Sequence, residues 1–494
     1  MKKLTALLLI LSFAAALFAG CGAAVPDDGG NGKSDNTGPA EAPAENETKE
    51  EDIPFPHEVR DFGGTVFRVL IDKETVNFLD IEDLDVTEIN GDVLNDAYYD
   101  RKCIVEETYN TVLEGRHETN MVTFVNKVIQ SGDDEYDAYA PRLMNAGTFA
   151  ANGYAVNLLD TDLTLGAPWW DQNIVRDTSI GGAAYFIAGD IFTKHYDGIS
   201  LLMFNKKLAD DLNLESPYQL VSDNKWTIDK FNSMVKGVTA DINGDGVMNR
   251  YDRYGFITQL DYISSILNAC GERIASKDKN DLPVFTGATE KISNIIDKML
   301  DIYVGDTYCL HRDGYDKEGG GGKLVQFWIF PEGRGLFYWS FPRYIDLGLR
   351  DMEDDFGILP LPKWDPEQSR YYAALNNWHS YTYMIPRSAR DASRSAYIMD
   401  ALAYHGRKII KPAYYDVCLQ RKYARDEESS AMLDIIFSST VYDLGSVYDI
   451  GGYIGAFQGD FQKGDNSIAS SYEKVAGKID KSINDIIEQF ETNK

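Results

Sequence analysis

Predicted strands and helices alternate at the start of the globular sequence, and this alternation limits the fold more than any other feature. Segments rich in β-branched and aromatic residues predict strands, and the segments between them predict helices. The strands are expected over 65–72, 111–115 and 136–142, and the helices over 91–110 and 120–133. This order predicts an α/β fold with a mostly parallel sheet. Ligands approach the carboxyl ends of strands in such sheets, which places Arg142 and its neighbours near a cleft.

The remaining sequence contains more helix. A body of about 440 residues is too long for one simple core, so two lobes or more are expected. The apolar residues of 291–303 recur at helical spacing, at Ile292, Ile295, Ile296, Met299, Leu300 and Tyr303. Further strands are expected at 254–257, 333–340, 355–362 and 381–386, and the chain after residue 386 is predicted to be mostly helical.

The N-terminus has the pattern of an export signal. Lys2 and Lys3 precede an apolar run from Leu4 to Phe18, which is too short to cross a bilayer. The segment LFAGC resembles a bacterial lipobox, although Phe18 stands where leucine is usual. The resemblance implies a signal peptide over 1–20 and a diacylglyceryl group on the sulfur of Cys21. The alternative is an ordinary secreted protein cleaved near residue 19 or 20.

A tether is predicted over residues 21–56. This segment holds Gly, Pro, Ala and acidic residues with almost nothing to bury, so we expect it to be disordered. The lipid anchor and tether would hold the body at the extracellular face of the cytoplasmic membrane. The net charge of −30 becomes −32 once the two signal lysines are removed, which argues against nucleic acid or an anionic lipid surface as a partner.

The cysteines show no metal-binding or redox motif. Apart from Cys21, the chain has Cys103, Cys270, Cys309 and Cys418, and none of them forms a CxxC pair. Buried free thiols are the favoured interpretation. A disulfide stays open as the alternative, because an exported protein meets oxidising conditions.

The loop DINGDGVMNRYD, residues 241–252, has oxygen donors at the spacing of a calcium site. Calcium takes about six to eight oxygen ligands. The donors would be the side chains of Asp241, Asn243, Asp245 and Asp252, the carbonyl of Val247, and Asn249 through a water molecule, with Gly246 at the sharp turn. The alternative is an Asx- and Gly-rich turn without metal. No second copy follows, so a structural calcium is predicted rather than a paired sensor.

Several segments, in this order, resemble the extracellular solute-binding lipoproteins of bacterial ABC importers, in the large family 1 of maltodextrin-binding type. They are IAGD (187–190), ISLLMFNKKLADDLNLESPYQL (199–220), KWTIDKFNSMVKGVTADINGDGVMNRYDRYGF (225–256), GLFYWS (335–340) and FGILPLPK (356–363). The resemblance covers roughly 60–480, and it depends on the order and spacing of these segments.

The resemblance implies a two-lobed α/β fold of the type II periplasmic-binding-protein kind, with hinge-linked lobes and a helical C-terminus. One lobe would comprise 57–187 and 382–425, and the other 188–381 and 426–494. The crossing strands would lie near Ile187–Asp190 and Tyr381–Ile385. The expected partners are a sugar or oligosaccharide and the permease subunits of an ABC importer, and a monomer is expected.

Ligand-binding candidates follow from the chemistry of sugars, whose apolar CH faces stack on aromatic rings and whose hydroxyls bind polar side chains. The candidates are Trp169, Trp170, Trp339, Trp378, Asp190, Asp197, Arg142 and Arg343. Each has an alternative, because a Trp beside another aromatic residue is often a packing residue and Asp190 can cap a turn. Trp339 is the strongest tryptophan candidate, because the family has a ligand-facing aromatic after the corresponding strand.

Two other classes of function stay open. A secreted carbohydrate-active hydrolase would need two carboxylates across a sugar cleft, and the abundant acids neither support nor exclude such a pair. The sequence contains no HExxH or GxSxG motif, so we expect no enzyme activity. A calcium-dependent surface adhesion module is the second alternative, although such modules usually carry the calcium loop in duplicate.

Overall fold

The computed structural model describes residues 53–73, 84–304, 307–311, 329–349, 352–420 and 427–493. The predicted signal peptide, Cys21 and most of the predicted tether lie outside these residues. The chain from Pro54 onward forms one compact unit. Among the described helices, none combines the length and apolar character that crossing a bilayer requires.

A three-stranded parallel sheet forms from the first part of this unit, and it confirms the predicted alternation. Its elements are β1 (Thr65–Asp72), α1 (Val93–Tyr109), β2 (Thr111–Glu118), α2 (Met121–Ser131) and β3 (Ala138–Ala140), with strand order β2-β1-β3. Asp92 caps α1 by accepting from the N–H groups of Leu94 and Asn95. The helix ends at Asn110, whose left-handed backbone turns the chain into β2.

A five-stranded mixed sheet forms the core of the second part. Its strands are β4 (Leu201–Asn205), β5 (Tyr254–Thr258), β8 (Cys309–His311), β9 (Gly335–Ser340) and β10 (Phe356–Leu359), in the order β10-β4-β9-β5-β8. β5 runs parallel to β8 and β9, whereas β4 runs antiparallel to β9 and β10. All residues of these strands are buried, which explains why their sequences are nearly continuous apolar runs.

Several helices lie around this second sheet, and α9 (Glu290–Tyr303) covers the stretch whose apolar spacing predicts a helix. They are α5 (Lys206–Asp211), α6 (Pro217–Ser222), α7 (Ile228–Val238), α8 (Ile263–Ala269), α9 (Glu290–Tyr303) and α12 (Arg343–Gly348), and a two-stranded sheet forms from β6 (Ala275–Lys277) and β7 (Pro283–Phe285). The predicted apolar stripe of α9 is buried, apart from Leu300, which is only half-buried. Ile302, which is not in the predicted stripe, is buried as well.

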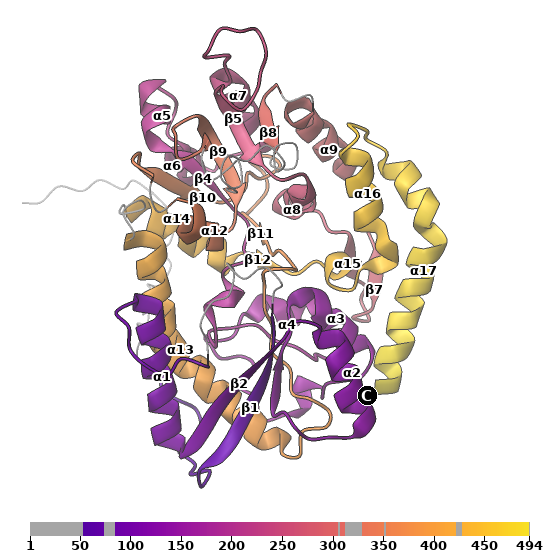
Figure 1. The fold of residues 1–494 in the computed structure, drawn as a ribbon. Helices are drawn as coiled ribbons and strands as arrows, with labels where there is room; N and C mark the ends of the chain where they lie inside the picture. The colour runs from indigo at the N-terminus through magenta and orange to yellow at the C-terminus, as the bar shows by residue number, and fades with distance from the viewer. Residues whose placement is uncertain are drawn as a thin grey trace, which may run out of the picture. The chain divides into compact units, whose positions relative to one another are not determined.

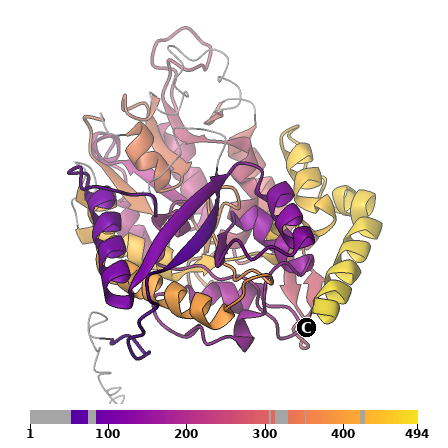
Figure 2. The same ribbon diagram turned by 60° about the horizontal axis from the view of Figure 1, so that its bottom comes forward.

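The C-terminal part is mostly helical, as predicted. It contains α13 (Ala392–Gln420), α14 (Glu427–Ser438), α15 (Leu444–Val447), α16 (Tyr453–Phe461) and α17 (Ile468–Asn493), and β12 (Thr440–Val441) pairs with β11 (Ala373–Ala374). Earlier in the chain are α3 (Leu143–Ala151) and α4 (Gln172–Thr178). Helix α13 packs against α1, and Figures 1 and 2 show these two helices running alongside β1 and β2.

The two segments predicted to cross between lobes lie side by side. Ile187 and Tyr383 exchange main-chain hydrogen bonds of 3.0 and 2.7 Å. The segment after Tyr383 also pairs with the first sheet, because Met384 exchanges main-chain hydrogen bonds with Tyr139 at the β3 strand. The predicted strand 381–386 is therefore present as a series of single bridges rather than as a continuous ladder.

Helix α13 holds the first crossing segment from one side. Gly406 allows this close approach, because a Cβ there would lie 1.8 Å from the carbonyl oxygen of Asp190. The next residue, Arg407, places Nη1 3.2 Å from Asp190 Oδ2. The side chain of Asp190 is therefore bound to the helix that covers it.

A buried carboxylate on α13 joins distant parts of the chain. Asp400 is fully buried, and its Oδ1 accepts from the indole N–H groups of Trp169 and Trp170 at 3.0 and 2.8 Å. Its Oδ2 accepts from the N–H of Thr164 at 2.8 Å and lies 3.0 Å from His57 Nε2. A carboxylate can take this number of bonds because each oxygen has two lone pairs.

Replacing Asp400 with asparagine should destabilise the protein, because the amide NH2 would face N–H donors and leave at least one of them buried without an acceptor. We expect the free energy of unfolding to fall by about 2–4 kcal/mol, measured by urea denaturation. Asp480→Asn, on an exposed position of α17, is the matched control and should change it by less than about 0.5 kcal/mol. Equal stability of the two variants would contradict the role of Asp400.

Candidate functional site

The carboxyl end of the first sheet meets the segment 376–381. Asp72 is the last residue of β1, and Arg142 follows β3 as the N-cap of α3. Arg142 forms a main-chain bridge with Tyr381, whose hydroxyl donates to the carbonyl of Asp72 at 2.8 Å. Ligands of α/β proteins bind at such strand ends, so this is the position where a site is expected.

The second sheet reaches the same segment from another direction. β9 ends at Ser340, and the residues that follow it contact His379. The ring of Phe341 lies 5.6 Å from the ring of His379, and Arg343 Nη1 lies 3.5 Å from His379 Nδ1. We call Asp72, Arg142, Arg343, Trp378, His379 and Tyr381 the junction cluster, because these residues connect the strand ends of the two sheets.

Arg142 holds the junction cluster together electrostatically. Its Nε lies 3.3 Å from Asp72 Oδ2, which also accepts from Asn145 Nδ2 at 2.7 Å. The guanidinium group lies 5.0 Å from the centre of the Trp378 ring, which is a favourable cation–π distance. Trp378 is nevertheless 57% exposed. An exposed indole supported by a buried cation is a suitable surface for stacking a ligand.

A second cation lies against the junction cluster. Lys194 is buried, and its Nζ lies 4.9 Å from the centre of the Tyr381 ring. Asp197, three residues further, is also buried and accepts from the hydroxyl of Tyr414 at 2.9 Å. The sequence pointed to Asp197 but not to Lys194, whose position against Tyr381 arises only from the folded chain.

Four buried polar atoms near these strand ends have no hydrogen-bond partner among the described residues. They are Asp72 Oδ1, Trp339 Nε1, Ser340 Oγ and Ser380 Oγ. Burying a polar group without a partner costs free energy, so such atoms in a folded protein usually meet water or a ligand. A ring contact links this group to the junction cluster, because Tyr262 lies beside both Trp339 and Phe341.

The other two tryptophan candidates lie elsewhere. Trp169 and Trp170 are each 2% exposed, and both indole N–H groups are bound to Asp400. Asp190 is bound to Arg407 and accepts from the hydroxyl of Tyr196. These bonds agree with the packing alternative for Trp169 and Trp170, and they link Asp190 to Arg407 and Tyr196. None of these partners belongs to the junction cluster.

Several residues of the junction cluster are not predicted by the sequence. Asp72 could have been found, because it ends a predicted strand whose carboxyl end faces ligands in this class of sheet. His379, Ser380 and Tyr381 directly follow Trp378, but nothing in their pattern marks them.

His195, near Asp197 in sequence, is buried, and its burial lowers the pKa of the imidazole. Its Nε2 lies 3.5 Å from Asp171 Oδ2.

The calcium-type loop folds with the turns that its sequence predicts. Gly244 and Gly246 adopt positive φ angles of 72° and 79°. Asp241 accepts from both glycine N–H groups, and the bond from Gly246 contributes most to lowering the pKa of this carboxyl. Asp252 is fully buried and accepts from the N–H groups of Ile242 and Asn249. Ionised carboxylates with free lone pairs remain compatible with a cation here.

No group of three or more His, Cys, Asp or Glu side chains is arranged to hold a metal ion in the described part of the chain. The three aspartates of the predicted calcium set, Asp241, Asp245 and Asp252, do not form such a group. The described thiols agree with the interpretation without disulfides: Cys270 and Cys309 are buried, Cys103 is half-buried, and none of these three forms a disulfide. The side chain of Cys418 lies outside the described part.

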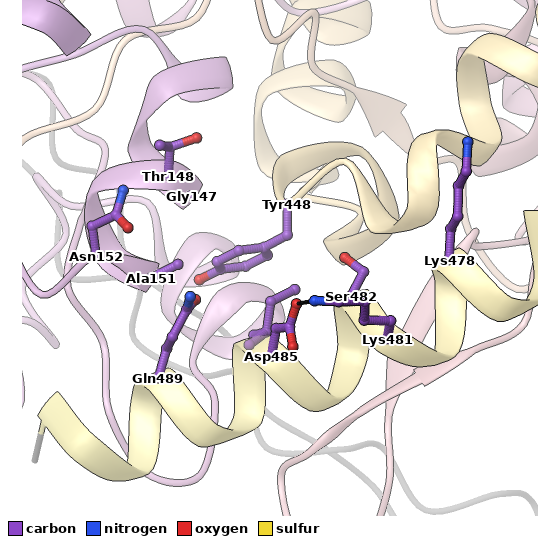
Figure 3. Close-up of a pocket in the computed structure, with 11 residues that line it drawn as sticks. Gly147, Thr148, Ala151, Asn152, Tyr448, Lys478, Lys481, Ser482, Asp485 and Gln489 are labelled. Carbon is purple, nitrogen blue, oxygen red and sulfur yellow. Dashed lines mark hydrogen bonds and ion pairs between the residues drawn. The ribbon is translucent and has the colours of Figure 1, made fainter.

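A cavity of about 350 Å³ lies away from the junction cluster, between α3 and α17. Gly147, Thr148, Ala151 and Asn152 line it from α3, and residues between Lys478 and Gln489 line it from α17. Figure 3 shows Tyr448 between these two groups and the ion pair of Lys481 with Asp485 at the rim. None of the predicted ligand-binding residues lines this cavity.

Comparisons with known proteins agree with the observed fold. A Listeria monocytogenes ABC substrate-binding protein in complex with cycloalternan is 11% identical, with a TM-score of 0.52, covering 87% of this chain and 99% of its own. UspC of M. tuberculosis is 12% identical, with a TM-score of 0.56 and coverages of 84% and 100%. A cyclo/maltodextrin-binding protein complexed with maltotetraose is 12% identical, with a TM-score of 0.52 and coverages of 86% and 96%.

No protein-family model matches the chain, and no curated protein matches it. The structural similarity nevertheless defines the fold class. The chain has the type II periplasmic-binding-protein fold that is found in solute-binding proteins of ABC transporters. This confirms the fold that the resemblance implied.

Proposed function

We propose that this protein is a lipid-anchored extracellular substrate-binding protein, which captures a sugar or oligosaccharide between two lobes and delivers it to an ABC importer. It acts by binding and release and has no catalytic activity. The ligand is held by the junction cluster and by the buried polar atoms beside it. Closure of the lobes brings the strand ends of the two sheets together around the ligand.

The observation that carries this proposal is the combination of an exposed indole with unsatisfied buried polar atoms near the strand ends of the two sheets. Trp378 offers an aromatic face for the CH groups of a sugar ring, and Arg142 supports this ring from one side. Trp339 Nε1 is a buried donor, while Ser340 Oγ and Ser380 Oγ can donate or accept. Hydroxyl groups of a sugar are both donors and acceptors and can satisfy all of these atoms.

The structural neighbours favour the same class of ligand. The Listeria protein was solved with cycloalternan, and another neighbour was solved with maltotetraose. Identities of 11–12% do not transfer a particular ligand to this chain. The two neighbours support the broader inference that a fold of this kind, with an aromatic surface at its strand ends, binds a carbohydrate.

The two alternatives from the sequence have less support. In the junction cluster, Asp72 is the one carboxylate, and it is bound to Arg142 and Asn145, so the cluster lacks the second carboxylate of a glycosidase. An adhesion module would use the calcium loop as its contact surface. That loop is one connection between α7 and β5 within a continuous α/β unit, which suits a structural clip better.

Sugar binding should depend on Trp378. A thermal-shift panel of mono- and oligosaccharides identifies the ligand, because a ligand that binds only the folded state raises the melting temperature. In titrations with that ligand, Trp378→Ala should weaken binding by about 1–2 kcal/mol, which is roughly five- to thirtyfold. Trp364→Ala is the matched control, because Trp364 instead lies near Lys291 and Lys298 on α9.

A second candidate function is tested by the same panel. Hydrolysis of a bound oligosaccharide, followed by chromatography of the products, would favour the hydrolase. Binding without turnover is the expected result. If no sugar raises the melting temperature and Trp378→Ala behaves like Trp364→Ala, the proposed site is wrong.

We also propose that calcium binds the loop 241–252 as a structural ion. A chelator should lower the melting temperature, and added calcium should restore it, because the ion binds the folded loop more tightly than the unfolded chain. Asp241→Ala should abolish this calcium response and leave sugar affinity unchanged. Asp278→Ala, in another Asx turn, is the control. An identical melting temperature with and without chelator would identify the loop as a metal-free turn.

Lipid attachment at Cys21 is the remaining part of the proposal, and it rests on the lipobox-like segment. Cys21→Ala should shift the protein from the membrane fraction to the medium, because a single cysteine carries the whole anchor. The measurement is fractionation followed by immunoblotting, with Cys103→Ala as the control. Release of the unaltered protein into the medium would instead indicate an ordinary secreted protein.

A further inference from the structure

The first half of helix α17 is bound to elements around the second sheet. The ring of Tyr472 stacks on Phe285 of β7, with 5.1 Å between centroids and 15° between planes. Asp460 of α16 accepts from Ser471 Oγ at 2.6 Å and pairs with Lys474 at 3.2 Å. Figure 1 shows α16 and α17 running side by side at the C-terminal end of the ribbon.

The last turn of α17 is bound to a different part of the chain. Phe490 is 2% exposed, and its ring packs edge-on against Tyr185, with 5.1 Å between centroids. Tyr185 lies two residues before the crossing segment at Ile187. Phe490 also contacts Tyr448, at 5.9 Å between ring centroids.

Asn493 adds two polar bonds to this contact. Its Nδ2 donates to the carbonyl of Ala151, the last residue of α3, at 3.1 Å. Its own carbonyl accepts from Arg387 Nη2 at 3.2 Å. A Cβ on Gly153 would lie 2.4 Å from Asn493 Oδ1, so the end of α17 is seated directly on the chain that follows α3. Helix α17 therefore joins α16 and β7 to the chain around α3.

The contact at the end of α17 and the junction cluster lie at opposite ends of two elements, helix α3 and the segment 378–387. Arg142 at the start of α3 belongs to the cluster, and Ala151 at its end binds Asn493. The segment 378–387 runs in the same direction. Its residue Tyr381 forms a bridge with Arg142, and its residue Arg387 donates to the carbonyl of Asn493. The paired residues Ile187 and Tyr383 lie between these two ends.

The seam between α3 and α17 is not tightly packed, and its lining is mixed polar and apolar. The cavity of about 350 Å³ separates much of the two helices, and Thr148, Asn152, Ser482 and Gln489 are among its lining residues. Figure 3 shows these polar side chains around the gap. Beyond the cavity, Phe490 and Asn493 make the ring contacts and hydrogen bonds that join the end of α17 to Tyr185, Ala151 and Arg387.

We propose that the last turn of α17, through Phe490 and Asn493, is a latch that opposes lobe closure and so sets the ligand affinity of the protein. The inference rests on the proposed function, in which the lobes close over a ligand. Closing the junction cluster about the pivot at Ile187 and Tyr383 separates the parts on the far side of that pivot, so the latch contact has to break. The free energy needed to break the latch contact therefore reduces the free energy gained on ligand binding.

The first experiment measures closure without a ligand. Nitroxide labels on unnatural keto residues at Asp100 in α1 and Asp210 in α5 report the distance between the two sheets, because both positions are exposed. Asn493→Ala and Phe490→Leu should shift the distance distribution toward shorter distances. Asn484→Ala, at an exposed position of α17, should leave it unchanged. Distributions of all three variants that coincide with the unaltered protein would overturn the latch.

A second experiment measures affinity by titration with maltotetraose, or with the best sugar from the panel. Asn493→Ala should tighten binding by about fivefold or more, although Asn493 lies outside the site. Binding that is unchanged or weaker in this variant would overturn the latch, while leaving the proposed function intact. Shorter distances combined with no sugar binding would support the latch and contradict the proposed function. Asn493→Ala also removes little packing, so it tests the latch even if Phe490→Leu fails to fold.

Discussion

The structure depends on the main-chain pairing of Ile187 with Tyr383, two residues that are far apart in sequence. This pairing brings the two crossing segments together between the sheets. One of these segments continues from Trp378 to Arg387 and so passes from the junction cluster to the end of α17. The backbone bonds cannot be made by either segment alone, because a single extended strand leaves its N–H and C=O groups unpaired.

Hydrogen-bond accounting separates structural tryptophans from candidate ligand tryptophans better than burial does. Trp169, Trp170 and Trp339 are all nearly inaccessible to solvent. The first two donate to Asp400, so their polar atoms are already used within the fold. Trp339 Nε1 has no partner among the described residues, and it lies on the strand β9 that leads into the site. Trp378 is different again, because it is exposed and held by a cation.

Much of the fold could be predicted from local pattern. The strands β1, β2, β5, β9 and β10 and the helices α1, α2 and α9 lie where the sequence predicts them, because apolar spacing, caps and turns act over a few residues. The site was harder to predict. The sequence predicts Arg142, Arg343 and Trp378 as ligand-binding residues, and the structure brings them to one segment. Trp169, Trp170 and Asp190 are predicted for the same role, but they are buried and bound to side chains of α13. Their partners Asp400 and Arg407 are more than 200 residues away in sequence.

The sequence by itself determined the elements of this protein: the α/β alternation, the calcium-type loop, the export signal pattern and the order of segments that resembles solute-binding proteins. Each of these depends on residues that are neighbours along the chain. Only the tertiary structure decided which aromatic and charged side chains share a site. It also decided that α17 contacts both α3 and β7. Those outcomes depend on contacts between residues such as Asp72 and Tyr381, or Ala151 and Asn493, which no local pattern specifies.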